Sequence, residues 1–101
     1  MVRIYPDATS KKELKVIDFG KVEAGTKKEL TLYIYNQTAA YIIDLKIVLG
    51  HKDVMIEDFP TSLNPFESRP FKISWKPPLN FKKGLKIKYK IEGIEEYRPE
   101  G

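Results

Sequence analysis

Apolar residues that recur at every second position constrain the fold of this chain more than any other feature. A segment that ends in Asp18-Phe19-Gly20 is followed by a polar connection and then by an alternating run at residues 30–35. One face of that run carries Leu30, Leu32 and Ile34, and the opposite face carries Thr31, Tyr33 and Tyr35. A repeat of two is the repeat of a β-strand, whose side chains point alternately to the two faces of a sheet. The stretch therefore predicts two strands joined by a loop, the start of a sandwich.

Similar short segments recur along the chain, separated by glycine, proline and polar turn residues, and none shows helical spacing over three turns. We expect strands at residues 2–5, 14–19, 29–35, 42–49, 54–57, 70–76, 85–91 and 94–97, with Gly93 forming a turn between the last two. About seven short strands at this spacing predict an all-β fold, an immunoglobulin-like antiparallel β-sandwich without a substantial helix. We expect one domain at residues 14–97, with an N-terminal strand and loop at 1–13 and a frayed C-terminus at 98–101.

The phase of each strand predicts the core. Within residues 42–49, one face is expected to carry Ile43, Leu45, Ile47 and Leu49, and the other Ile42, Asp44, Lys46 and Val48. In the later strands, the residues expected to point inward are Phe71, Ile73, Trp75, Leu85, Ile87, Tyr89 and Ile91. Leu63, in a loop, is expected to plug the core. Burial of about sixteen such side chains, at roughly 1.5–3 kcal/mol each, can oppose chain entropy without a metal or a disulfide.

Composition narrows the class of protein. A chain of 101 residues with 42% hydrophobic residues suits one globular domain. It has no cysteine, which excludes a disulfide and a thiol nucleophile. No apolar run is long enough for a signal peptide or a membrane span, so we expect a soluble protein, cytoplasmic or assembled into a particle made in the cytoplasm. Heavy use of lysine, glutamate and isoleucine, with Gln37 as the only glutamine, resembles heat-adapted proteins.

The side chains that catalysis needs are nearly missing. His51 is the only histidine, and it stands in a turn two residues before Asp53, where the pair would at most help to hold a cation. The carboxylate pairs Glu57-Asp58 and Glu95-Glu96 are neighbours in expected strands, so their members point to opposite faces rather than into one cleft. We therefore expect no enzyme, no catalytic residue, no metal, no cofactor and no small-molecule substrate.

Several segments together resemble a known domain. These are Asp18-Phe19-Gly20, Val22, Gly25 and the alternating strand that ends at Asn36, followed by residues 59–68 (FPTSLNPFES) and the strand 71–77 (FKISWKP). They look like the ASH-type domains of abnormal-spindle and Hydin proteins, relatives of major sperm protein. The resemblance covers residues 14–91, although residues 64–67 (NPFE) lack the glycine usual in that turn. It implies a non-enzymatic scaffold or adaptor of the kind found in cytoskeletal, ciliary and bacterial or phage-particle proteins.

Positive charge is concentrated in the last third of the chain. Residues 68–91 contain eight basic residues and no acidic one, so the rest of the chain carries −4 against a total of +4. Five lysines form a stripe within and just before the expected strand 85–91: Lys82, Lys83, Lys86, Lys88 and Lys90. Lysines at alternate positions of one strand share a face, where they can contact phosphates or an acidic protein surface. The alternative is a solvated face whose lysines discourage sheet-to-sheet aggregation.

Tyr33 and Tyr35 form a second candidate surface, because they point away from the leucine and isoleucine face of their strand. In an immunoglobulin-like order this strand pairs with residues 71–75, which would place the tyrosines beside Lys72 and Lys76. This surface has three interpretations. In the first, the aliphatic parts of the lysine side chains lie on the tyrosine rings; in the second, the N-terminal strand covers the rings; in the third, the surface is a docking face for another subunit.

Two functions follow as hypotheses. The first is a structural or protein-protein interaction module that joins a larger assembly by binding a protein partner or by self-assembly, with a virus or phage particle component as one concrete version. The second is binding of nucleic acid or another polyanion through the stripe between Lys82 and Lys90. No membrane partner is expected.

Overall fold

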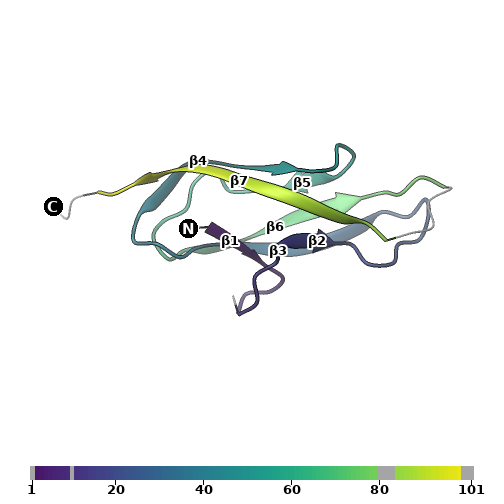
Figure 1. Cartoon of the computed structure of the whole chain (residues 1–101), viewed down its shortest axis with the longest axis horizontal. Coiled ribbons are helices and arrows are strands. Elements are labelled where there is room, and N and C mark those ends of the chain that lie inside the picture. Colours follow the sequence, from purple (N-terminus) through teal and green to yellow (C-terminus); the bar gives the residue numbers. More distant parts are fainter. Residues whose placement is uncertain (1, 10, 80–83, 99–101) are drawn as a thin grey trace.

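The computed structural model describes residues 2–9, 11–79 and 84–98, and within these residues every regular element is a β-strand. The seven strands form an elongated body of 58 × 24 × 18 Å (Figure 1). In chain order they are β1 (Val2–Tyr5), β2 (Val16–Asp18), β3 (Lys28–Asn36), β4 (Tyr41–Leu49), β5 (Met55–Glu57), β6 (Ser68–Trp75) and β7 (Lys86–Glu96). The all-β prediction is confirmed.

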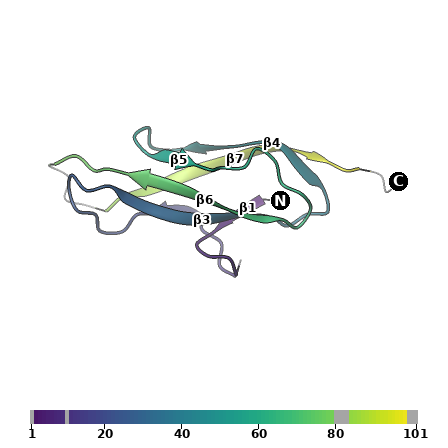
Figure 2. The same ribbon diagram turned by 180° about the vertical axis from the view of Figure 1, so that it is seen from behind.

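The strands form two antiparallel sheets that face each other, as the front and back views show (Figures 1 and 2). One sheet has the order β1-β3-β6-β5 and the other the order β2-β7-β4. The first order reproduces strands A, B, E and D of an immunoglobulin constant-type domain, and β4 with β7 reproduces strands C and F. The predicted pairing of residues 29–35 with residues 71–75 is confirmed by the register from Lys28↔Trp75 to Tyr35↔Ser68. The protein is therefore an immunoglobulin-like β-sandwich.

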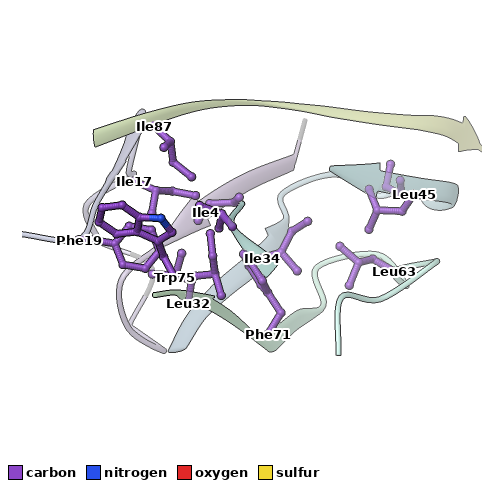
Figure 3. Packing of buried hydrophobic residues seen from close by; sticks show 13 residues of the cluster. Ile4, Ile17, Phe19, Leu32, Ile34, Leu45, Leu63, Phe71, Trp75 and Ile87 are labelled. Atoms are coloured by element: carbon purple, nitrogen blue, oxygen red, sulfur yellow. The ribbon is translucent and has the colours of Figure 1, made fainter. Parts of the chain in front are cut away.

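The core lies between the two sheets (Figure 3). Phe19 and Trp75 pack at one end, with ring centroids 5.9 Å apart, and Leu45 and Leu63 lie at the other. Both Trp75 and Leu63 are buried as predicted, at 2% and 1% exposure. The fully buried side chains come from alternate positions of strands in both sheets, which is the arrangement that excludes water from a sandwich.

The side chain of a buried asparagine connects two turns at the end of β3 by hydrogen bonds. Asn36 is 0% exposed, and its Nδ2 donates to the carbonyl oxygens of Ala40 and Asn64 at 2.8 and 2.9 Å. Its Oδ1 accepts from the backbone N–H and the hydroxyl of Thr38 at 3.0 and 2.7 Å. An amide has two donors and one oxygen with two lone pairs, so these four bonds satisfy the whole group.

The predicted phase of residues 42–49 is wrong in its first half, because β4 contains a β-bulge. The register of β4 against β7 shifts between Ile43 and Lys46, so that Asp44 and Leu45 together oppose Gly93. Asp44 takes a positive φ of 51°, which reverses the alternation at this point. Ile42 consequently points inward with Leu45, at 0% and 4% exposure, while Ile43 lies on the outer face.

The predicted turn at Gly93 is also wrong. β7 runs without interruption from Lys86 to Glu96, and Gly93 is the strand position opposite the bulge. A Cβ at Gly93 would lie 2.8 Å from Cγ2 of Ile42, so the bulged strand fits against β7 only where the side chain is absent. The expected strand 94–97 is thus the second half of one long strand.

Candidate interaction surfaces

The predicted lysine stripe lies on the outer face of the sheet β2-β7-β4. Lys86, Lys88 and Lys90 are exposed at alternate positions of β7, while Ile87 between them is 3% exposed, as the alternation predicts. Lys82 and Lys83 lie outside the described residues. We call the outward side of this sheet the lysine face.

Neighbouring strands supply acidic and apolar residues to the lysine face. Across from β7, Asp18 of β2 stands opposite Lys86, and Val16 stands opposite Lys88. On the other side, Val48 of β4 stands opposite Lys90. Val16 and Val48 are 37% and 50% exposed. The lysines therefore alternate with apolar side chains across the sheet and do not form an uninterrupted cationic surface.

Glu92 neutralises part of this charge. Its carboxylate lies 3.2 Å from Nζ of Lys46 and 3.7 Å from Nζ of Lys90. The hydrogen bond and the positive charge from Lys46, together with Lys90, hold the pKa of Glu92 below its ordinary value. Lysines bind a phosphate backbone by replacing the counterions condensed on it, and lysines already paired with a carboxylate are less available for this.

The lysine face is shallow. A depression of about 250 Å³ is lined by Val48, Leu49, Gly50, Lys88, Tyr89 and Lys90. The Tyr89 ring points inward and its hydroxyl donates to the carbonyl oxygen of Leu14. Burial raises the pKa of Tyr89, and the nearby Glu13 carboxylate adds to this. Tyr89 is thus part of the packing and is not presented as a platform for stacking a base.

The tyrosine surface is arranged differently from the expectation. Tyr33 stands between Tyr5 of β1 and Pro70 of β6, and Tyr35 stands between Arg3 and Ser68. The rings of Tyr5 and Tyr35 meet edge to face, with centroids 6.3 Å apart. β1 therefore flanks β3 within the same sheet, and its Tyr5 packs against the half-buried Tyr35 ring.

Of the two lysines expected beside the tyrosines, Lys72 stands opposite Thr31 on β3 and Glu57 on β5. This position is two residues from the pair Tyr33↔Pro70 on the same face, so Lys72 is a diagonal neighbour of Tyr33. Lys76 follows the last residue of β6, beyond the pair Lys28↔Trp75, so placing it near the tyrosines was wrong. The alternation predicts the face on which a residue lies, but it does not predict which residue stands opposite on the neighbouring strand.

His51 packs against the core. Its ring meets the Trp75 ring edge to face at 5.8 Å, and its Nδ1 accepts the backbone N–H of Asp53 at 3.2 Å. Within the described part of the chain, no three histidine or acidic side chains come together in a way that could hold a metal ion.

A feature that the sequence interpretation missed is an open edge on β7. On one side of β7, β4 pairs with residues 89–96. On the other side, β2 pairs only with residues 86–88. Among the described residues, no strand pairs with the rest of that side, and we call this side of residues 90–96 the free edge of β7. The prediction of a turn at Gly93 concealed it, because it divided β7 into two short strands.

Apolar side chains are exposed at the same end of the molecule. Ile94 of β7 is 53% exposed and Tyr97 is 69% exposed. Ile94 pairs with Ile43 across the sheet, and Arg98 lies 4.0 Å above the ring of Tyr41. This end of the sheet β2-β7-β4 therefore combines exposed apolar and aromatic side chains with the ion pair between Arg98 and Glu96.

Comparison with known proteins gives no match, whether to a family model, to a curated protein or to a solved structure. In the described residues, no helix is present that could span a membrane.

Proposed function

We propose that this protein is a non-enzymatic structural module that binds protein chains and acts as a small building block of a larger assembly. The observation that carries the proposal is the free edge of β7, bordered by exposed Ile94 and Tyr97. Unpaired strand edges recruit other chains through main-chain hydrogen bonds, and exposed apolar side chains supply the burial that makes such contacts stable.

The sequence resemblance to ASH-type domains supports this proposal, since those domains serve as scaffolds and adaptors. The immunoglobulin-like strand order is compatible with that membership, which we propose together with a place in the cytoplasm or in a particle assembled there. A virus or phage particle component remains the most concrete version, because such particles use many copies of small sandwich domains.

Polyanion binding through the lysine face has weaker support. Glu92 pairs with Lys46 and Lys90, and Asp18 stands opposite Lys86. If about five phosphates were nevertheless neutralised, the logarithm of the binding constant would fall with the logarithm of the salt concentration at a slope near −4.5. A gel shift with duplex and single-stranded DNA at low salt tests this function, and a shift with that salt slope would favour it over the module.

Cross-linking in solution tests the module directly. The purified chain, alone and with extract of its source, is treated with a lysine-reactive cross-linker, and the linked peptides are identified by mass spectrometry. We expect links between chains at the lysine face, at Lys46, Lys86, Lys88 and Lys90, and few at the exposed Lys11 and Lys12 of the β1–β2 loop. A chain that stays monomeric by light scattering and gives no interchain link in either sample refutes the proposal.

A further inference from the structure

The backbone groups on the free edge of β7 can be identified from the neighbouring hydrogen bonds. The carbonyl of Lys88 accepts the N–H of Gly50, so Lys88 faces the side of β4. The carbonyl of Leu85 accepts the N–H of Phe19, so Leu85 faces the side of β2. Because backbone groups alternate along a strand, Ile91, Gly93 and Glu95 direct their N–H and C=O groups to the β2 side.

The described residues that precede β2 in the sequence do not pair with β7. The N–H of Leu14 donates to the carbonyl of Ile4, at 2.7 Å, so the segment before β2 contacts β1 of the other sheet. Among the described residues, no strand continues β2 along Ile91, Gly93 and Glu95. In an immunoglobulin constant-type domain this is the place of strand G, which flanks strand F. The free edge can therefore accept one more strand.

The charges of β7 indicate which strand fits. Its first half carries Lys86, Lys88 and Lys90, and its second half carries Glu92, Glu95 and Glu96. A second β7 laid parallel to the first would put lysine against lysine. Laid antiparallel and centred on Gly93, it puts Lys90 of each strand opposite Glu96 of the other. Opposite charges directly across two strands stabilise a pair, and like charges destabilise it.

We propose that a second copy of this chain pairs antiparallel with the free edge of β7 across a two-fold axis, joining two three-stranded sheets into one. This inference rests on the proposed function and specifies its surface and partner. The register is centred on Gly93, which faces Gly93 of the other copy. Ile91 exchanges hydrogen bonds with Glu95, and the Lys90 side chain faces Glu96 at a close, non-hydrogen-bonded position. This register fills residues 90–96 and stops before β2.

A proline substitution tests the edge. Glu95 is exposed, and its N–H lies on the free side, so Glu95→Pro removes a donor that the monomer leaves unpaired. The control Glu95→Ala removes the same side chain and keeps the N–H. By sedimentation equilibrium of the full chain, we expect Glu95→Pro to weaken self-association by about tenfold or more and Glu95→Ala by about twofold or less. Thermal unfolding followed by circular dichroism verifies that both variants fold.

Charge exchange tests the partner and the register. In the proposed dimer, Lys90→Glu places glutamate against Glu96, and Glu96→Lys places lysine against Lys90, so each variant alone should associate about tenfold more weakly. Mixing the two variants restores both attractive pairs in a heterodimer, which native mass spectrometry with one isotope-labelled chain detects. Heterodimers in excess of both homodimers support the proposal.

The outcomes separate the two proposals. If the wild-type chain self-associates but Glu95→Pro associates equally well, or if mixing restores nothing, the self-pairing edge is refuted and the interaction module stands. If the free edge binds an acidic extended peptide while the chain stays monomeric, the second copy is refuted as its occupant. A monomer that gives no interchain cross-link with any protein refutes both.

Discussion

Replacing Asn36 with alanine should destabilise the fold strongly, although the residue lies in neither candidate surface. Its amide makes four hydrogen bonds, to Ala40, Asn64 and Thr38, and is 0% exposed. Asn36→Ala leaves the backbone N–H of Thr38 without its partner, whereas the carbonyl of Ala40 keeps the Thr38 hydroxyl at 3.4 Å and the carbonyl of Asn64 keeps the N–H of Glu67 at 3.2 Å. A buried group left unpaired costs about 1–3 kcal/mol, and each lost bond to a carbonyl that keeps another donor costs about 0.5 kcal/mol, so we expect a loss of roughly 2–4 kcal/mol. Such a loss is a large part of the about 5–15 kcal/mol that stabilises a domain.

Urea unfolding followed by Trp75 fluorescence measures this loss, because the indole is 2% exposed in the folded chain and solvated in the unfolded one. The midpoint of thermal unfolding should fall by about 15 °C, at roughly 4–8 °C per kcal/mol for a domain near this size. As a control, Ser62→Ala at an exposed loop position should change stability by less than about 0.5 kcal/mol. A loss below about 1 kcal/mol in Asn36→Ala would show that water replaces the amide and that the reasoning is wrong.

The aspartate variant adds a pH signature. Asn36→Asp keeps the size of the side chain, but its carboxylate faces the carbonyl oxygens of Ala40 and Asn64 and cannot donate to them. The folded state should therefore hold the pKa of this carboxyl above the ordinary value of about 3.9. Since the folded state then binds the proton more tightly, the stability of the variant relative to wild type should fall as pH rises from about 4 towards neutrality. A difference between the two proteins that is independent of pH contradicts this mechanism.

Three further changes test local features of the fold. Phe66 has a φ of 56° and is 60% exposed, and asparagine adopts this left-handed conformation more easily than phenylalanine. Phe66→Asn should therefore raise stability by about 0.5–1 kcal/mol in urea unfolding, and a decrease would mean that the ring makes a necessary contact. Gly93→Ala should cost about 1–3 kcal/mol by the same assay, because the added methyl meets Ile42, and a neutral result would show that the bulge yields freely. The raised pKa of Tyr89 means that its neutral form stabilises the fold below pH of about 10 and that this contribution is lost as pH rises through the folded pKa. Wild type should then lose stability above that pH more steeply than Tyr89→Phe, and parallel curves would assign the loss to other groups.

The strands that could be predicted from the sequence are those in which alternation continues without a break. In β3 the pattern is regular from Leu30 to Asn36, so the faces are fixed once the period is recognised. β4 departs from this, because Asp44 adopts a conformation that an aspartate tolerates without requiring it. A one-residue bulge there exchanges the positions of Ile42 and Ile43, both of which are apolar. Composition therefore gives no sign of the change.

The lysine face shows a second limit, which concerns partners across strands. The exposure of Lys86, Lys88 and Lys90 follows from β7 alone, because Ile87 and Tyr89 between them point towards the core. Their neighbours across the sheet come from β2 and β4. The register of β4 depends on its bulge, and the length of β2 is limited because the residues before it contact β1. A row of like charges in one strand therefore predicts a face and leaves its net charge undetermined.

The size of the free edge bears on how such a building block would assemble. Residues 90–96 form one short strand pair, and a contact of this size lies below the roughly 1,200 Å² that stable interfaces bury. Its ion pairs would be exposed and screened, each worth about 1 kcal/mol or less. A dimer held by this edge alone should therefore be weak and salt-sensitive. Within an assembly of many copies, however, each edge would be held at a high effective concentration, and weak pairs would then act together. The light-scattering, sedimentation and cross-linking experiments are therefore to be run at high chain concentration and low ionic strength, where even a weak edge-to-edge dimer is populated.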